Sequence, residues 1–314
     1  MENSKNRFLY ATAVLPYELR AVLKNAPDFI INNALEVILR TNKPLCIECV
    51  NKRYYFTKSG CITDSILSSD MLICTSKTLF ETFQSICNFS VYSKQSEINS
   101  GYITINGGHR VGISGTCVLN NNKIVNIKDI TTLNIRIARE IIGCSDELRN
   151  SINPLNGVLL CGAPCSGKTT LIRDLARTLS LEYKVTVVDE RNELASSVSG
   201  VAQNDLGLCD IFNSYLKDDA ITHSVRSMSP DIIVCDEIST IRDLSTIENS
   251  VNCGVSFIAT IHSDGIEKML SRKSVRELLK TRAFNQIVFL DNKHNIGKIK
   301  SIVNLSEIES DLIA

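Results

Sequence analysis

Residues 162–169 read Gly-Ala-Pro-Cys-Ser-Gly-Lys-Thr, which satisfies every position of the pattern G-x-x-x-x-G-K-[ST]. Residues 158–161 before this loop, Val-Leu-Leu-Cys, form an apolar run typical of a buried strand. Residues 168–180 after the loop carry apolar side chains at helical spacing. A strand before the pattern and a helix after it are the context that a phosphate-binding loop requires. We therefore take this loop as the feature that decides the fold of the second half of the chain.

Each residue type in the loop has a chemical reason. Gly162 and Gly167 let the backbone turn so that its N–H groups point at an anion, and the helix N-terminus adds a partial positive charge. Lys168 can reach the β- and γ-phosphates, and the Thr169 hydroxyl can ligate Mg²⁺. We expect ATP and Mg²⁺ as ligands. The residues expected to bind the nucleotide are Gly162, Ala163, Pro164, Cys165, Ser166, Gly167, Lys168, Thr169 and Thr170.

Strands and helices alternate from residue 151 onward. A helical pattern covers residues 241–252, and apolar strand-like runs occur at residues 184–188, 232–235 and 255–261. This alternation predicts a mostly parallel sheet with helices on both faces. Two last runs, at residues 286–290 and 298–303, flank a turn and predict a terminal hairpin. We expect residues 151–314 to form an α/β P-loop ATPase domain.

Polar residues follow three of these strands, at the edge where ligands bind in open α/β sheets. Asp236 suits the Walker B role of holding Mg²⁺, and Glu237 can polarise the attacking water as a general base. Glu190 belongs to a second acidic pair, which could orient water or Mg²⁺ or pair locally with Arg191. His262 follows the last strand and could sense the γ-phosphate, although a packed polar residue would also fit there.

Composition restricts the class of protein. The chain carries 34 basic and 34 acidic residues, so its net charge is zero. Residues 1–150 have 17 basic and 13 acidic side chains, or +4, and residues 151–314 have 17 and 21, or −4. Neither half has the basic excess of a dedicated nucleic-acid binder. With no run near the roughly 20 apolar residues of a membrane span, and no signal-peptide core at the start, we expect a cytoplasmic protein without a transmembrane segment.

The twelve cysteines are then expected to be reduced thiols that serve as small apolar residues. Cys46 and Cys49 form the one C-x-x-C of the chain, and neither a second pair nor a histidine follows at zinc spacing. We expect no zinc site there. Cys165 lies inside the phosphate loop, and we hypothesise that its oxidation or alkylation blocks nucleotide binding.

The ordered set of motifs resembles the bacterial secretion ATPases of type II and type IV systems, with their RecA-like core, acidic box and histidine box. A narrower resemblance, to the stage III sporulation protein AA family, rests on residues 34–45, 101–140, 187–194 and 226–231. Residues 187–194 read Val-Val-Asp-Glu-Arg-Asn-Glu-Leu, and residues 226–231 read Arg-Ser-Met-Ser-Pro-Asp. The resemblance covers residues 13–305, and these segments are more specific than the phosphate loop alone.

The resemblance implies a secretion-type motor ATPase of endospore formation that powers or assembles a channel complex between mother cell and forespore. Its implied partners are further copies of itself, in a hexamer, and membrane proteins of the stage III A channel. Its implied place is the mother-cell cytoplasm, peripheral to the septal membrane. Two alternatives stay open, a RecA-type motor driven by nucleic acid and an ATP-gated assembly scaffold with little hydrolysis. The weak +4 charge disfavours the first, and the intact Asp236–Glu237 pair disfavours the second.

Residues 1–150 are predicted to form a smaller α+β domain. Residues 15–39 have a mainly helical pattern, and residues 76–89 a second helix with one apolar face. Short strands are predicted within residues 44–62, and a hairpin joins residues 102–105 to residues 111–119.

Four arginines are candidates for reaching the nucleotide. The resemblance implies that arginines of the N-terminal domain contact the phosphates, which makes Arg110, Arg136 and Arg139 candidates. Arg136 and Arg139 are three residues apart and could share a helix face, in which case either could be structural. Arg226 precedes the Walker B strand and could reach the nucleotide or a neighbouring subunit, or form a surface ion pair.

Overall fold

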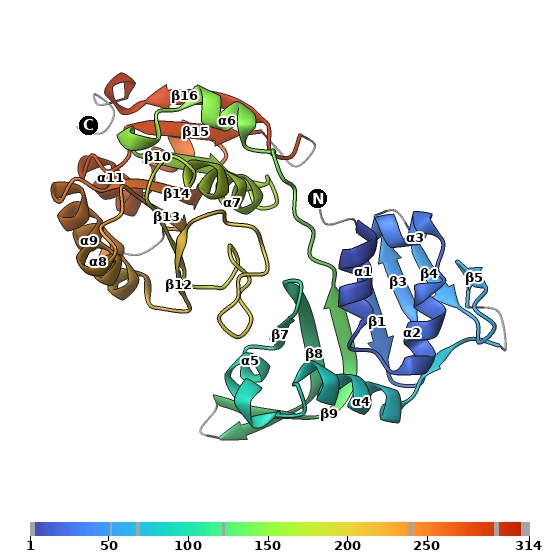
Figure 1. The fold of residues 1–314 in the computed structure, drawn as a ribbon. Coiled ribbons are helices and arrows are strands. Elements are labelled where there is room, and N and C mark those ends of the chain that lie inside the picture. Colours follow the sequence, from blue (N-terminus) through green and yellow to red (C-terminus); the bar gives the residue numbers. More distant parts are fainter. Residues whose placement is uncertain are drawn as a thin grey trace. The chain divides into compact units, whose positions relative to one another are not determined.

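The structure is a computed structural model that describes residues 4–50, 52–66, 70–120, 123–238, 241–291 and 295–308. Two compact units make up the chain (Figure 1). The N-terminal unit comprises Met1–Arg139 together with Val198–Gln203, and the core unit comprises Glu140–Ser197 together with Asn204–Ala314. Compared with the predicted division after residue 150, residues 140–150 belong to the core unit and residues 198–203 to the N-terminal unit.

The N-terminal unit is built on a seven-stranded sheet in the order β5-β4-β3-β1-β9-β8-β7. All of its neighbouring strands run antiparallel. The strands are β1 (Ala34–Arg40), β3 (Cys46–Cys49), β4 (Arg53–Phe56), β5 (Ile62–Thr63), β7 (Tyr102–Ile105), β8 (His109–Asn120) and β9 (Lys123–Arg136), while β2 (Lys43–Pro44) and β6 (Ile73–Cys74) pair separately. The helices are α1 (Ser4–Thr12), α2 (Tyr17–Lys24), α3 (Asp28–Asn33), α4 (Ser76–Ile86), η1 (Tyr92–Lys94) and α5 (Gln95–Asn99). The unit is thus of the expected α+β type.

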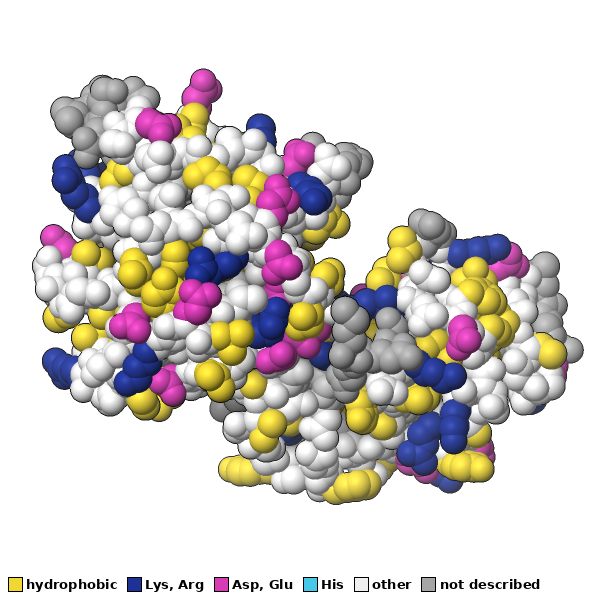
Figure 2. Space-filling model, turned by 45° about the horizontal axis from the view of Figure 1, so that its top comes forward, with side chains coloured by type: hydrophobic (Ala, Val, Ile, Leu, Met, Phe, Trp, Pro, Cys, Tyr) yellow, Lys and Arg dark blue, Asp and Glu magenta, His cyan; other side chains and the backbone are white. Residues whose placement is uncertain are grey.

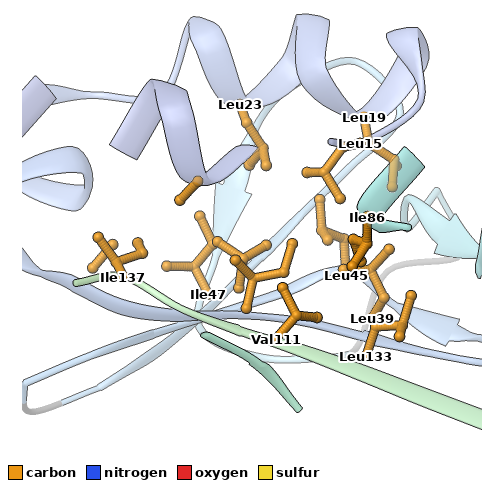
Figure 3. Close-up of a cluster of buried hydrophobic side chains, with 14 of the residues drawn as sticks. Leu15, Leu19, Leu23, Leu39, Leu45, Ile47, Ile86, Val111, Leu133 and Ile137 are labelled. Atoms are coloured by element: carbon orange, nitrogen blue, oxygen red, sulfur yellow. The ribbon is translucent and has the colours of Figure 1, made fainter. Parts of the chain in front are cut away.

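One apolar core lies between the helices and the sheet of this unit. Leu19 and Leu23 are one turn apart on helix α2, which places them on one side of that helix, and Leu15 lies just before the helix, ahead of Pro16. Their side chains point towards the sheet, where Leu39 and Leu133 lie in the same cluster (Figure 3). All of these leucines are buried, so the sequence pattern of this helix is explained by the core that it covers.

Two segments of this unit differ from the sequence prediction. Residues 34–40 form strand β1 and not the end of a helix, and β1 lies between β3 and β9 with most of its side chains buried. Buried residues on both faces of an inner strand produce a continuous apolar run, which resembles a helical pattern. Residues 123–136 form β9, so Arg136 lies at a strand end and does not share a helix face with Arg139.

The core unit contains a second seven-stranded sheet in the order β12-β11-β13-β14-β10-β15-β16. Its strands pair in parallel except for the last pair, which forms the predicted antiparallel hairpin. The strands are β10 (Val158–Gly162), β11 (Val185–Asp189), β12 (Asp210–Asn213), β13 (Ile232–Glu237), β14 (Ser256–His262), β15 (Gln286–Leu290) and β16 (Ile299–Asn304). The helical elements are α6 (Asp146–Ser151), η2 (Pro154–Asn156), α7 (Lys168–Leu179), α8 (Lys217–Ser227), α9 (Ile241–Asn252), α10 (Ile266–Leu270), α11 (Lys273–Lys280) and η3 (Leu305–Glu307).

The register of the core sheet brings the polar strand ends together. Strand β10 pairs with β14 so that Gly162 lies opposite His262. Strand β11 pairs with β13 so that Val188 lies opposite Cys235, one residue before the acidic pairs that follow on each strand. The phosphate loop, both acidic pairs and the histidine therefore share one edge of the sheet, as predicted. Among the helices that the structure describes, none has the length and apolar character to cross a membrane.

Candidate nucleotide-binding site

The phosphate loop joins the buried strand β10 to helix α7 and has the backbone shape of an anion-binding loop. Cys165 and Gly167 both adopt positive φ angles, of 64° and 94°. When residues in the left-handed conformation alternate with right-handed ones, successive backbone N–H groups point to the same side and form a nest for an anion. A Cβ atom on Gly162 would lie 2.4 Å from Ser166 Oγ and 3.2 Å from Ser166 Cβ, so a larger residue there would have to displace the Ser166 side chain. That hydroxyl is buried and has no hydrogen-bond partner among the described residues.

Lys168 holds a desolvated ammonium at the start of α7. The residue is 6% exposed, and its Nζ atom donates to the carbonyl oxygens of Gly162 and Ala163, both at 2.9 Å. The same Nζ lies 3.1 Å from Nδ1 of His262. Burial lowers the pKa of Lys168, although the charges of nearby carboxylates act in the opposite direction. A buried cation whose ammonium is hydrogen-bonded to two main-chain carbonyl groups is suited to receive a phosphate anion.

His262 and Glu237 continue this chain of contacts along the edge of the sheet. His262 Nε2 lies 3.8 Å from Glu237 Oε1, so the imidazole stands between the loop lysine and the predicted general base. Arg191 Nη1 lies 3.2 Å from the other carboxylate oxygen of Glu237. Three residues that are far apart in the sequence, Lys168, Glu237 and His262, are thus brought together as the strand ends predicted.

Asp236 lies beside this group in an acidic environment. Its Oδ1 atom accepts a hydrogen bond from Thr260 Oγ1 at 3.2 Å. Burial raises the pKa of Asp236 to about 6, and the negative charge of Glu193 adds to the effect. A divalent cation would remove that penalty, so the carboxylate fits Mg²⁺. In the described part of the chain no cluster of three or more His, Cys, Asp or Glu could hold a metal ion, so phosphate and water oxygens would have to complete the coordination.

The first acidic pair has divided roles. Asp189 is fully buried, and its carboxylate accepts the backbone N–H groups of Glu193, Leu194 and Ala195 at 2.7, 3.0 and 2.8 Å. It therefore shapes the loop that follows β11. Glu190 keeps a partly exposed side chain at the sheet edge, and its Oε2 lies 3.6 Å from Lys217 Nζ. Glu190 is the member of the pair that is available to a ligand.

Two residues near the site, Glu193 and Lys217, were not predicted from the sequence. The charge of Glu193 acts on Asp236, and it lies on the loop shaped by Asp189. Lys217 is the first residue of α8, close behind the short strand β12. The β12 segment, Asp-Ile-Phe-Asn, lacks the apolar run of the other strands, so no local pattern indicates that the next helix begins at this edge.

The four predicted arginines lie as follows. Arg226 is exposed in the last turn of α8. In the N-terminal unit, the guanidinium of Arg110 lies 4.8 Å from the centre of the Tyr102 ring. Arg110 and Arg136 are opposite each other on β8 and β9, and Arg136 Nε lies 3.5 Å from a carboxylate oxygen of Glu36. Arg139 donates to a main-chain oxygen at 2.9 Å. A nucleotide contact for any of the four stays a prediction.

The parallel sheet, the loop and the N-terminal unit together define a P-loop ATPase fold, and a solved structure shares it. The pilus retraction motor PilT with bound ADP is 15% identical, with a TM-score of 0.52, and the alignment covers 82% of this chain and 74% of that one. The Legionella pneumophila ATPase DotB is 16% identical, with a TM-score of 0.48, and the alignment covers 82% and 72% of the two chains. At 15% identity, the likeness to PilT concerns the fold alone.

Sequence comparison places the chain within one family. The family model described as "Sporulation stage III, protein AA" matches residues 5–309. Stage III sporulation protein AA of Bacillus subtilis (strain 168) is 31% identical over 298 residues, which cover 92% of each chain. The chain belongs to the sporulation stage III protein AA family, and the resemblance drawn from its motifs is confirmed.

Proposed function

We propose that this chain binds Mg-ATP and hydrolyses it as a secretion-type motor ATPase of endospore formation. It would power or assemble a channel complex between mother cell and forespore. The observation that supports this most directly is the line of contacts from Lys168 through His262 to Glu237, since it joins the phosphate loop to a general base. Membership in the sporulation family supports the biological setting.

The proposed roles follow from where the side chains lie. Lys168 and the loop N–H groups would bind the phosphates, and Glu237 would take a proton from the attacking water. Thr169 and Asp236 would hold Mg²⁺, which supplies charge neutralisation at the phosphates. His262 would respond to the γ-phosphate, because it touches both the lysine and the base. Glu190 would orient water or Mg²⁺ from the neighbouring strand, and Arg226 is proposed to reach the nucleotide or an adjacent subunit.

The proposed assembly is a hexamer at the mother-cell face of the septal membrane, docked on membrane proteins of the stage III A channel. In such a ring Arg110 or Arg136 could act on the phosphates of a bound nucleotide, as an arginine finger does. Nucleic acid is not a proposed partner, because the chain has zero net charge and basic and acidic side chains are interspersed on the face drawn in Figure 2.

The test compares the wild-type protein with Glu237→Gln, and with Glu267→Gln as a control on the exposed surface of α10. We expect Glu237→Gln to bind ATP within about threefold of wild type and to lose turnover by roughly 10²-fold or more, since only the proton transfer is removed. Phosphate release, nucleotide affinity and particle mass with and without Mg-ATP are measured. Normal hydrolysis by Glu237→Gln would refute the general-base role.

Two other outcomes would replace the proposal. Tight ATP binding without turnover in the wild-type protein favours a nucleotide-gated scaffold. Turnover that rises strongly on addition of single- or double-stranded DNA or RNA favours a nucleic-acid-dependent motor. A nucleotide-dependent increase in mass to that of a ring, together with loss of turnover in Glu237→Gln, supports the secretion-type motor.

A further inference from the structure

A buried lysine bridges the ends of two neighbouring strands in the core unit. Lys217, the first residue of α8, is only 8% exposed. Its Nζ atom donates to the main-chain oxygen of Glu237 at the end of β13 and lies 3.6 Å from Oε2 of Glu190, just past β11. Burying an ammonium is strongly unfavourable unless its charge and its N–H groups are matched. The two groups that match it here come from the two acidic pairs at the nucleotide edge.

The contact with Glu237 falls at an irregular point of the sheet. Strands β13 and β14 pair residue by residue up to Cys235 and Ala259, and then Glu237 pairs with Thr260, which leaves Asp236 as an extra residue. Such a bulge redirects side chains, and bulges of this kind often lie beside active sites. The lysine ammonium holds the carbonyl at the far end of the bulge. It thereby fixes the backbone from which the Glu237 carboxylate extends.

The contact between Lys217 and Glu190 lies at the same edge of the sheet as the contact between Lys217 and Glu237. Glu190 and Glu237 are both acidic and would both face the anionic phosphates of a bound nucleotide. The Lys217 ammonium beside the Glu190 carboxylate offsets part of this repulsion and restrains the orientation of that carboxylate. Arg191 and His262 touch the Glu237 carboxylate itself, whereas Lys217 touches its main chain, so the three side chains restrain different parts of the residue.

We propose that Lys217 is a positioning residue for ATP hydrolysis, which fixes Glu237 through its main chain and Glu190 through its carboxylate. This inference rests on the proposed ATPase function. Lys217 does not touch the reacting atoms in this role. It acts on the geometry of the two acidic residues that do, so its loss affects the chemical step and leaves nucleotide binding in place.

The test uses the full chain with Lys217→Met, which keeps length and removes charge, and Lys217→Arg, which keeps charge. The control is Lys268→Met, on an exposed lysine of α10. We expect Lys217→Met to lower kcat by about 100-fold, as for a misplaced catalytic group, with KM and Mg-ATP affinity within about threefold of wild type. Lys217→Arg is expected to recover part of kcat, and Lys268→Met to match wild type.

A double variant separates positioning from a merely structural role. If Lys217 acts through Glu190, then Lys217→Met combined with Glu190→Gln has about the same kcat as the slower single variant. If the losses in kcat of the two single variants instead multiply in the double variant, Lys217 does not act through Glu190. A Lys217→Met variant with wild-type kcat, or one that loses nucleotide affinity as much as kcat, overturns the positioning role. A wild-type protein that does not hydrolyse ATP refutes the proposed function itself, which is a different result from an active Lys217→Met variant.

Discussion

The ammonium of Lys168 lies 3.1 Å from Nδ1 of His262, which links the helix after the phosphate loop to the end of strand β14. The two residues are 94 positions apart, and the parallel pairing of β10 with β14 brings them together. The same ammonium is bound by two loop carbonyl groups and is almost completely shielded from water. An anion that enters the loop would therefore change the surroundings of both side chains at once.

Replacing Lys168 by methionine should separate ligand binding from stability. Burial lowers the pKa of Lys168, so the folded protein disfavours the charged form, and removal of the charge should leave the Tm of the nucleotide-free protein equal or higher. Wild type should gain about 2.7 kcal/mol of stability at ATP concentrations of 100 times Kd, and Lys168→Met should gain none. Thermal unfolding with and without Mg-ATP measures both. A lower Tm without nucleotide, with the ATP effect retained, would contradict this account.

His262 should matter for turnover more than for affinity. Its two ring nitrogens face different partners, Lys168 on one side and Glu237 on the other. We expect His262→Ala to lower kcat by roughly 10- to 100-fold and to change ATP affinity by less than about threefold. Steady-state kinetics and equilibrium binding measure the two quantities.

Two further His262 variants identify which contact is used. Asparagine places a polar atom near the position of Nδ1, and glutamine places one near Nε2. If His262→Asn is the more active of the two, the contact with Lys168 carries the effect. If His262→Gln is the more active, the contact with Glu237 does. Loss of ATP affinity with unchanged kcat would show that His262 belongs to the binding site and has no part in sensing.

The core of the site could be predicted because its residues follow one topological rule. Apolar runs before Gly162, Asp189, Asp236 and His262 predicted parallel strands, and parallel strands end at the same edge. The structure confirms those strands, and at their common edge it shows contacts from Lys168 to His262 and from His262 to Glu237. The rule needs no knowledge of side-chain packing, which is why it works on a single sequence.

The residues and elements that the sequence did not predict depend on tertiary packing, which leaves no local pattern in the sequence. The Asp189 carboxylate is enclosed by three backbone N–H groups of its own loop, and only the folded loop reveals that it is structural. Strand β1 was predicted as helix because a strand buried on both faces has no alternation. Lys217 was missed because strand β12, which precedes its helix, is short and polar. The role of a buried charge is recognised from the residues that contact it, and those residues can be distant in the sequence.

Gly157 should be the glycine of the core unit that tolerates alanine least. It has a φ of 71°, and a Cβ atom there would lie 1.9 Å from the main-chain oxygen of Ala283. Gly254 in the same unit has a φ of 88° and nothing within 4 Å of such an atom, so it serves as the matched control. We expect Gly157→Ala to lower the free energy of unfolding by roughly 3 kcal/mol or more, and Gly254→Ala by about 1 kcal/mol. Denaturant unfolding measures both values, and equal losses would show that the backbone angle alone sets the penalty.

His109 in the N-terminal unit should make stability depend on pH. The side chain is fully buried, and its Nδ1 accepts the backbone N–H of Ala138 at 3.0 Å. Its Nε2 has no hydrogen-bond partner among the described residues, and a Cβ atom on Gly107 would approach it to 2.6 Å. Burial, and next the charge of Arg7, lower the pKa of His109 to about 4. The ring is therefore neutral in the folded protein at physiological pH.

The direction in which stability changes with pH follows from the protonation of His109 in the folded and unfolded states. Between about pH 6.5 and pH 4 the unfolded chain binds a proton at His109 that the folded chain does not bind, so stability falls as the pH falls through this window. The full difference of about 2.5 pH units corresponds to about 3 kcal/mol, and above pH 6.5 the histidine makes no contribution. His109→Asn keeps an acceptor near the position of Nδ1 for the Ala138 N–H and removes the titration. The free energy of unfolding, measured from pH 7 to pH 4, should therefore fall more steeply for wild type than for His109→Asn. Parallel curves for the two proteins would mean that the folded state accommodates the imidazolium, and that the buried site is open to water or to an acceptor.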